Sequence, residues 1–193
     1  MNTHNLLKEI TQTLLQNASP EGLAAHHKFV PGASQQKVYG VRMPVLNQLA
    51  KDYKDGGFEL VEALWESGAM EEKMLAAKVL GHIAKKDPER SIKLVALFSN
   101  EIKDWAVCDT LGMQSLKPIV KSHREAIFAL AQKLNKSKNL WQRRLSLVLV
   151  EWYTRMPELH PQINQLIKNL EADSEYYVKK AVVWIRKNFK KGK

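Results

Sequence analysis

The chain has 193 residues, with 30 Lys and Arg against 20 Asp and Glu, a formal net charge of +10 and an isoelectric point near 9.6. Its 45% hydrophobic and 26% charged residues exclude a wholly disordered chain, and its short apolar runs exclude a membrane-spanning helix of about 20 residues. The single cysteine, Cys108, excludes an internal disulfide, and the first residues lack a secretory signal, so we expect one soluble cytoplasmic domain over residues 1–193.

Helical periodicity covers most of the chain. The first helices end at a loop over 31–40, which is rich in Pro, Gly, Ser and Gln. A helix is predicted over 43–53, with Pro44 tolerated in its first turn. Further helices are predicted at 58–67, 70–85, 89–99, 105–118, 123–135, 139–155, 160–171 and 174–189. No window alternates as a strand would, so the fold class is predicted to be all-α.

Four of these helices resemble one another when their starts are aligned. The aligned copies begin at Glu71, Lys103, Asn139 and Glu175, with steps of 32, 36 and 36 residues and one further helix between copies. This period is typical of two-helix repeats, which bury their apolar faces against neighbouring repeats. We therefore predict a curved α-solenoid.

Asp109 is an exception within the aligned copies. The other copies place Ala77, Leu145 and Ala181 at its position. Arg144 lies directly before that position in the next copy. A charge at a core-like position is costly to desolvate unless it is paired or used. One interpretation is a salt bridge between Asp109 and Arg144 that fixes the stacking of repeats; the other is a functional site.

Trp105 precedes Asp109 by four residues, so the indole and the carboxylate share one helix face. Asp104 is the better candidate for the helix N-cap, which leaves Asp109 without a capping role. Trp184, at the end of the fourth copy, is compatible with an ordinary core position.

The basic excess lies in the last two fifths of the chain. Residues 1–116 carry 13 basic and 14 acidic side chains, a net of −1, whereas residues 117–193 carry 17 basic and 6 acidic ones, a net of +11. Clustered Lys and Arg favour a polyanionic partner, because they release the counterions condensed on phosphates. A lysine-rich surface also keeps a protein soluble, so the charge alone leaves both interpretations open.

Four segments together resemble the AlkD-like DNA alkylation repair proteins, which are DNA glycosylases built from HEAT-like repeats. They are YGVRMPVLNQLAK at 39–51, DWAVCD at 104–109, LWQRR at 140–144 and YYVKKAVVWIRK at 176–187. The resemblance runs from Tyr39 to Phe189, and it implies HEAT-like repeats with a concave basic groove. Family members usually continue past the last of these helices, so we expect a shorter groove at that end.

The resemblance implies a catalytic site of Asp109, Trp105, Arg144 and Trp184. The family's substrates are purines alkylated at N3 or N7, which are cationic and leave without a general acid. Asp109 would stabilise the oxocarbenium-like sugar and position water. Trp105 and Trp184 would pack against the deoxyribose, and Arg144 would hold a phosphate and keep Asp109 ionised.

On the same architecture, the groove would present basic side chains to duplex DNA. The predicted DNA-binding residues are Arg143, Arg144, Lys179, Lys180, Arg186 and Lys187, followed by a basic tail at 190–193. We expect a monomer with no cofactor, nucleotide, metal or membrane partner; His26 and His27 lack further ligands at metal-binding spacing. The alternatives are a non-catalytic binder of damaged or branched DNA and a protein–protein scaffold.

Overall fold

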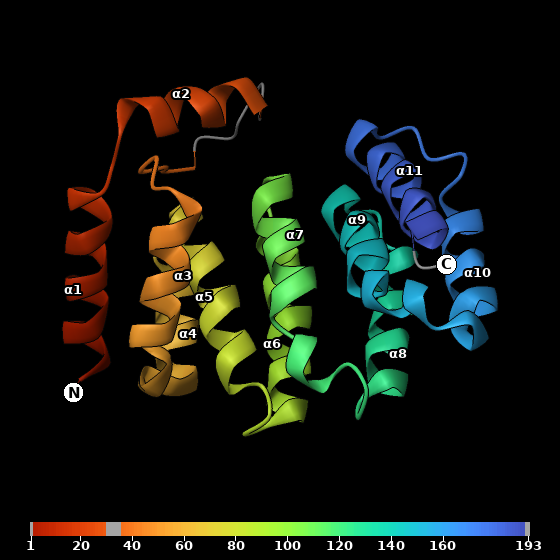
Figure 1. Cartoon of the computed structure of the whole chain (residues 1–193), viewed down its shortest axis with the longest axis horizontal. Coiled ribbons are helices and arrows are strands. Elements are labelled where there is room, and N and C mark those ends of the chain that lie inside the picture. The colour runs from red at the N-terminus through yellow and green to blue at the C-terminus, as the bar shows by residue number, and fades with distance from the viewer. Residues whose placement is uncertain (1, 30–35, 192–193) are drawn as a thin grey trace.

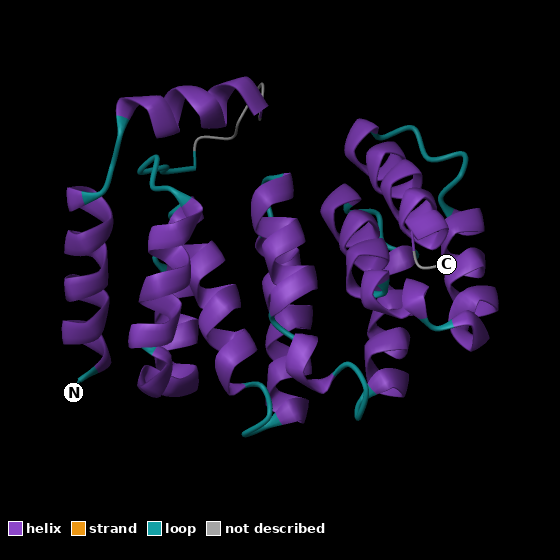
Figure 2. Cartoon of the chain, in the orientation of Figure 1, coloured by secondary structure: helices purple, strands orange, loops and turns teal. Residues whose placement is uncertain are grey.

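The computed structural model describes residues 2–29 and 36–191, and its regular secondary structure within these ranges is helical throughout (Figures 1 and 2). The α-helices are α1 (Thr3–Gln16), α2 (Pro20–Phe29), α3 (Met43–Asp52), α4 (Gly57–Glu66), α5 (Met70–Ile83), α6 (Pro88–Phe98), α7 (Trp105–Gln114), α8 (Arg124–Asn135), α9 (Leu140–Leu149), α10 (His160–Asn169) and α11 (Tyr176–Lys191). The short 3₁₀ helices are η1 (Lys54–Gly56), η2 (Ser99–Glu101), η3 (Lys117–Ile119), η4 (Glu151–Arg155) and η5 (Pro157–Leu159). The predicted all-α fold is confirmed.

The predicted bounds of the helices from residue 43 onward agree with the structure to within two residues, except for two helices that end earlier than predicted. The helix predicted over 105–118 ends at Gln114 and is followed by η3, because Pro118 has no N–H to continue the helical ladder. The helix predicted over 139–155 ends at Leu149 and tightens into η4. Met156 then has an extended backbone, as expected for a residue before proline.

The helices form two stacked rows. One row, here called the inner row, places α3, α5, α7, α9 and α11 side by side in chain order; the other contains α1, α4, α6, α8 and α10 (Figure 1). The four aligned sequence copies are α5, α7, α9 and α11, so the predicted repeats are confirmed as successive layers of a solenoid.

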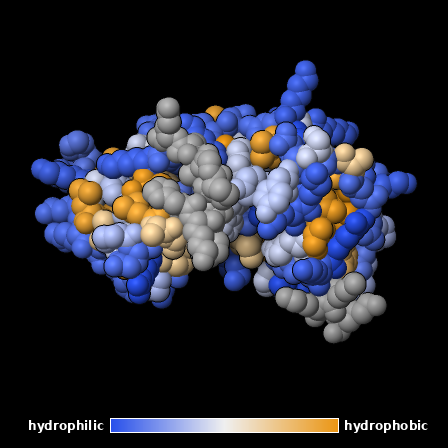
Figure 3. All heavy atoms as spheres, turned by 90° about the horizontal axis from the view of Figure 1, so that it is seen from above, coloured by the Kyte–Doolittle hydropathy of each residue, from blue (hydrophilic) through white to orange (hydrophobic). Residues whose placement is uncertain are grey.

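Apolar side chains hold the two rows together. One continuous cluster of buried apolar side chains contains residues of both rows, such as Leu75 of α5 and Leu64 of α4. Within the other row, Trp65 of α4 stacks on Phe98 of α6 with ring centroids 4.2 Å apart. Seen from above, hydrophilic side chains cover most of the surface and leave separate apolar patches (Figure 3). None of the described helices is both long and apolar enough to cross a membrane.

Two buried glutamates in the first turn of α5 join the N-terminal segments to the repeats. Glu71 accepts hydrogen bonds from the backbone N–H groups of Tyr39, Gly40 and Val41, at 3.1, 2.7 and 3.1 Å. Glu72 accepts from Thr11, Ser67 and the Tyr39 hydroxyl. Sequence reasoning missed these residues, because an acidic first turn is ordinarily a solvated feature.

Candidate functional site

Local capping sets the positions of the two helices that carry the candidate site. Asp104 accepts hydrogen bonds from the N–H groups of Ala106 and Val107, at 2.7 and 2.9 Å, so the predicted N-cap of α7 is confirmed. Asn139 likewise caps α9 by accepting from Trp141 N. Asp109 therefore lies inside α7 with its carboxylate available for another role.

Asp109 and Arg144 form a bidentate ion pair between successive repeats. Arg144 donates from Nε to Oδ1 at 2.9 Å and from Nη2 to Oδ2 at 2.8 Å, and its Nη1 donates to the carbonyl oxygen of Tyr177 at 2.7 Å. One guanidinium thus links α7, α9 and α11. The Arg144 side chain is 9% exposed and that of Asp109 is 24% exposed, so the carboxylate also faces solvent.

This arrangement contains the predicted inter-repeat salt bridge. It also leaves part of the hydrogen-bonding capacity of the Asp109 carboxylate unused. A carboxylate has about four lone-pair positions, and the two bonds from Arg144 occupy only part of them. Burial by itself lowers the pKa of Arg144, but hydrogen bonding to Asp109 raises it overall, so the guanidinium stays charged.

The neighbouring thiol cannot serve as a nucleophile. Cys108 is fully buried, and burial raises the pKa of its thiol well above the ordinary value. Its Sγ lies 3.6 Å from the carbonyl oxygen of Trp141. Of these two neighbouring side chains, the Asp109 carboxylate is therefore the one that reaches solvent.

Aromatic rings lie at the same positions of successive inner helices. Trp105 is half-buried one turn before Asp109, and the rings of Trp141 and Tyr177 lie 5.0 Å apart at the starts of α9 and α11. Tyr176, 58% exposed, meets Tyr177 edge-on. Trp184 is half-buried and packs partly on the hydrophobic core, in line with the core interpretation, while keeping some exposed surface.

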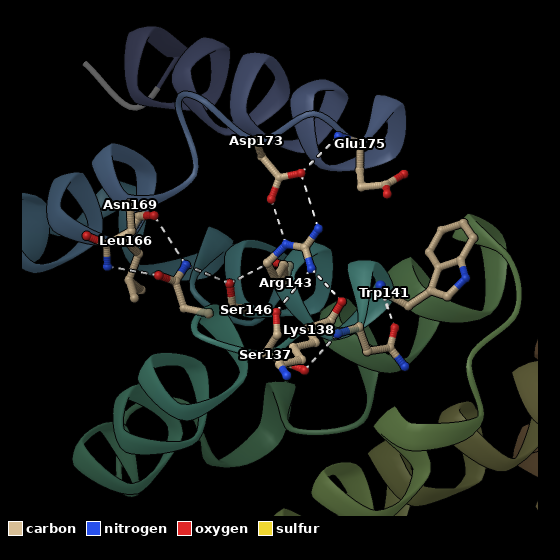
Figure 4. A network of polar contacts seen from close by, with 11 residues as sticks. Ser137, Lys138, Trp141, Arg143, Ser146, Leu166, Asn169, Asp173 and Glu175 are labelled. Carbon is tan, nitrogen blue, oxygen red and sulfur yellow. Dashed lines mark hydrogen bonds and ion pairs between the residues drawn. The ribbon is translucent and has the colours of Figure 1, made fainter.

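Arg143 is occupied by contacts within the fold (Figure 4). Its Nε and Nη2 donate to Asp173 at 2.6 and 3.2 Å, and its Nη1 donates to the carbonyl oxygens of Ser137 and Lys138. The side chain therefore ties α9 to the loop before α11. Its predicted contact with DNA is untested, and these bonds leave few donors for it.

The other predicted DNA-binding residues lie on α11. Arg186 forms an ion pair with Glu171, whereas Lys179, Lys180 and Lys187 are exposed. Arg186 is exposed as well, but its charge is paired, so these lysines present the freer charges of this helix to solvent.

Three predictions fall partly outside the described residues. The predicted loop over 31–40 does so for residues 31–35, and residues 36–40 are in neither a helix nor a strand, as expected for a loop. Helix α11 continues to Lys191, so the predicted tail at 190–193 begins within it; the side chains from residue 190 onward lie outside the described part of the chain. The side chain of His27 lies outside it as well. Within the described residues, no three His, Cys, Asp or Glu side chains are grouped so as to hold a metal ion.

A family profile described as "DNA alkylation repair enzyme" matches residues 10–191 of the chain. The chain belongs to the DNA alkylation repair enzyme family. Membership confirms the resemblance drawn from the four sequence segments and gives the protein a role in the repair of alkylated DNA, with DNA as its substrate. No curated protein gives a significant match.

The part played by Tyr177 in this repair enzyme was missed from sequence. Its ring lies against Trp141, and its carbonyl oxygen anchors Arg144. The sequence did contain a signal for the aromatic contact, because Tyr177 aligns with Trp105 and Trp141 in the repeat copies. A backbone carbonyl, however, is contributed by every residue type, so the sequence does not reveal its contact with Arg144.

The Arg143–Asp173 pair of this repair enzyme predicts a pH dependence of stability. Burial by itself raises the pKa of Asp173, but hydrogen bonds from Arg143 and from Glu175 N lower it overall below its ordinary 3.8. The resulting stabilisation is complete above the unfolded value and is lost as the pH falls through the lower folded value. We expect the melting temperature to fall below about pH 4, and to fall less steeply in Asp173→Asn. Thermal unfolding between pH 6 and 3 measures this; two parallel profiles would contradict it.

Proposed function

We propose that this repair enzyme is a DNA glycosylase that hydrolyses the N-glycosidic bond of cationic N3- and N7-alkylated purines in duplex DNA. The observation that carries the proposal is the Asp109 carboxylate, held by a buried arginine, partly open to solvent and one helical turn from the half-buried Trp105. An ionised carboxylate beside an electron-rich ring suits a developing cation.

The proposed reaction needs no proton donor at the base. As the C1′–N bond breaks, its electron pair moves to the purine and neutralises the positive charge on the ring. The sugar becomes oxocarbenium-like, and Asp109 stabilises that charge. Water then adds to C1′ and gives up a proton, which the carboxylate accepts or passes to solvent. The products are the free base and an abasic site.

The remaining residues of the predicted catalytic set position this chemistry. Trp105 and Trp184, each half-buried, would contact the deoxyribose with the exposed parts of their rings. Arg144 holds both carboxylate oxygens of Asp109 in place and has one further hydrogen on each of Nη1 and Nη2 for a phosphate. Lys179, Lys180 and Lys187 would contact other phosphates.

The decisive measurement is release of free base from duplex DNA that contains 7-methylguanine. We expect release well above the spontaneous rate with the wild-type protein and none from undamaged duplex. Release at the spontaneous rate would refute the glycosylase proposal. If duplex DNA still bound with a steep salt dependence, the non-catalytic binder would be favoured; without duplex affinity, the scaffold would be.

A further inference from the structure

A polar hollow of about 470 Å³ lies where the C-terminal ends of α3, α5 and α7 meet. Among the described residues, its lining includes four basic side chains, those of Lys51, Lys78, His82 and Lys117, and no carboxylate. None of these residues belongs to the predicted DNA-binding set, and three of them come from the nearly neutral first 116 residues.

Lys78 is a buried cation without a neutralising partner. The residue is 4% exposed, and its Nζ donates to the amide oxygens of Asn47 and Gln114 at 2.7 and 2.9 Å. Among the described residues it forms no ion pair, whereas the buried Lys73 of the same helix pairs with Glu101. Two amide oxygens satisfy hydrogen bonds but leave the charge uncompensated, and an ammonium has a third N–H to donate.

The hollow depends on a close approach of two inner helices. A Cβ at Gly81 would lie 2.5 Å from the carbonyl oxygen of Gln114, so glycine lets the end of α7 meet α5 there. This contact brings the Gln114 side chain to Lys78. Helix-dipole compensation explains basic residues in the last turn, such as His82, but Lys78 lies more than one turn before the end of α5.

The basic groups around His82 form surroundings that favour an anion. Burial lowers the pKa of His82, and the charges of Lys54, Lys51 and Lys78 lower it further. These groups come from η1, α3 and α5, and Lys117 of η3 also lines the hollow. An anion among them would reverse this effect on His82.

The hollow lies along the inner row from Asp109. Met113, which lines it and is 45% exposed, follows Asp109 by one helical turn on the same face of α7. A duplex that brings a lesion to Asp109 therefore has backbone within reach of this hollow.

We propose that the hollow formed by Lys51, Lys78, His82 and Lys117 binds a backbone phosphate of the DNA on the α3 side of the lesion. Lys78 provides the fixed buried charge, and Lys51 and Lys117 provide the exposed ones. The inference rests on the proposed function for the placement of the lesion. A free phosphate has the same chemistry, so the experiment separates the two sources.

The test compares duplex binding by Lys51→Gln/Lys117→Gln with that by Lys93→Gln/Lys133→Gln. Lys93 and Lys133 are exposed on α6 and α8 of the other row, so the control removes the same charge elsewhere. We expect the slope of log affinity against log salt to fall in magnitude by about 1 in the first variant, because the hollow binds one phosphate and each neutralised phosphate contributes about 0.9. The control should keep the wild-type slope. Equal slopes in all three proteins would overturn the inference.

A second measurement identifies the source of the phosphate. The pKa of His82, followed by NMR in the wild-type protein, should rise when duplex DNA binds. A rise with inorganic phosphate but none with duplex would show a site for a free phosphate and overturn the inference. Base release by the wild type is a separate readout: its absence would refute the glycosylase proposal even if the salt slopes behave as expected.

Discussion

Replacing Asp109 by Asn is expected to reduce release of 7-methylguanine by at least about 100-fold, because the neutral amide cannot stabilise the cationic sugar. The substitution keeps the size of the side chain, and one amide oxygen can still accept a hydrogen bond from Arg144. Single-turnover release at saturating enzyme measures the chemical step without the contribution of binding. Release equal to that of the wild type would refute the role given to Asp109.

A loss of activity in this variant could also come from loss of structure, since Arg144 would be left buried without its charge partner. Asp173→Asn is the matched control: it removes the carboxylate of another bidentate arginine pair, that with Arg143, and Asp173 has no hydrogen bond to Asp109, Trp105, Arg144 or Trp184 among those of the described residues. We expect both variants to lose stability by about 1–3 kcal/mol, measured by urea unfolding, and only Asp109→Asn to lose base release. Equal loss of release in both would point to destabilisation.

The features predictable from sequence are those that repeat or that act locally. The period of the aligned copies predicted the stacking of α5, α7, α9 and α11, and the neighbouring N–H groups made Asp104 recognisable as a cap. Asp109 was conspicuous because the other aligned copies have an apolar residue at its position, and Arg144 because it is a charge next to that position. In each case the information lies in neighbouring residues of one helix or in the comparison of aligned repeats.

The features that were not predictable depend on which side chains meet across repeats. Arg143 and Arg144 are adjacent in sequence; the pairing of Arg144 with Asp109 was one of the two interpretations from sequence, whereas the pairing of Arg143 with Asp173 was not expected. Lys73 and Lys78 lie on the same helix, and only Lys73 has an acidic partner. A count of charges along the sequence treats the two arginines alike and the two lysines alike, because it holds no information on which side chains they contact in the fold.

Glu71→Ala is expected to give the largest loss of stability among these variants, about 3–5 kcal/mol in the free energy of unfolding. The carboxylate is fully buried and accepts three backbone hydrogen bonds from residues 39–41. Bonds to a charged group contribute about 1.5–3 kcal/mol each, and water entering the partly exposed segment recovers some of that. Glu71→Gln keeps one oxygen as an acceptor and should lose less. Urea unfolding measures both variants.

The control for this loss is Glu59→Ala, which removes a glutamate from the first turn of the neighbouring α4, where the side chain is 67% exposed. Its contact with Arg90 spans 3.6 Å at the surface, so we expect a change within about 0.5 kcal/mol. If Glu71→Ala lost no more free energy of unfolding than Glu59→Ala, the prediction would be wrong. Water would then have to satisfy the three backbone N–H groups of residues 39–41 as well as the carboxylate does. Segment 39–41 would then be held to α5 by the Tyr39–Glu72 bond and by packing of the buried Tyr39 ring.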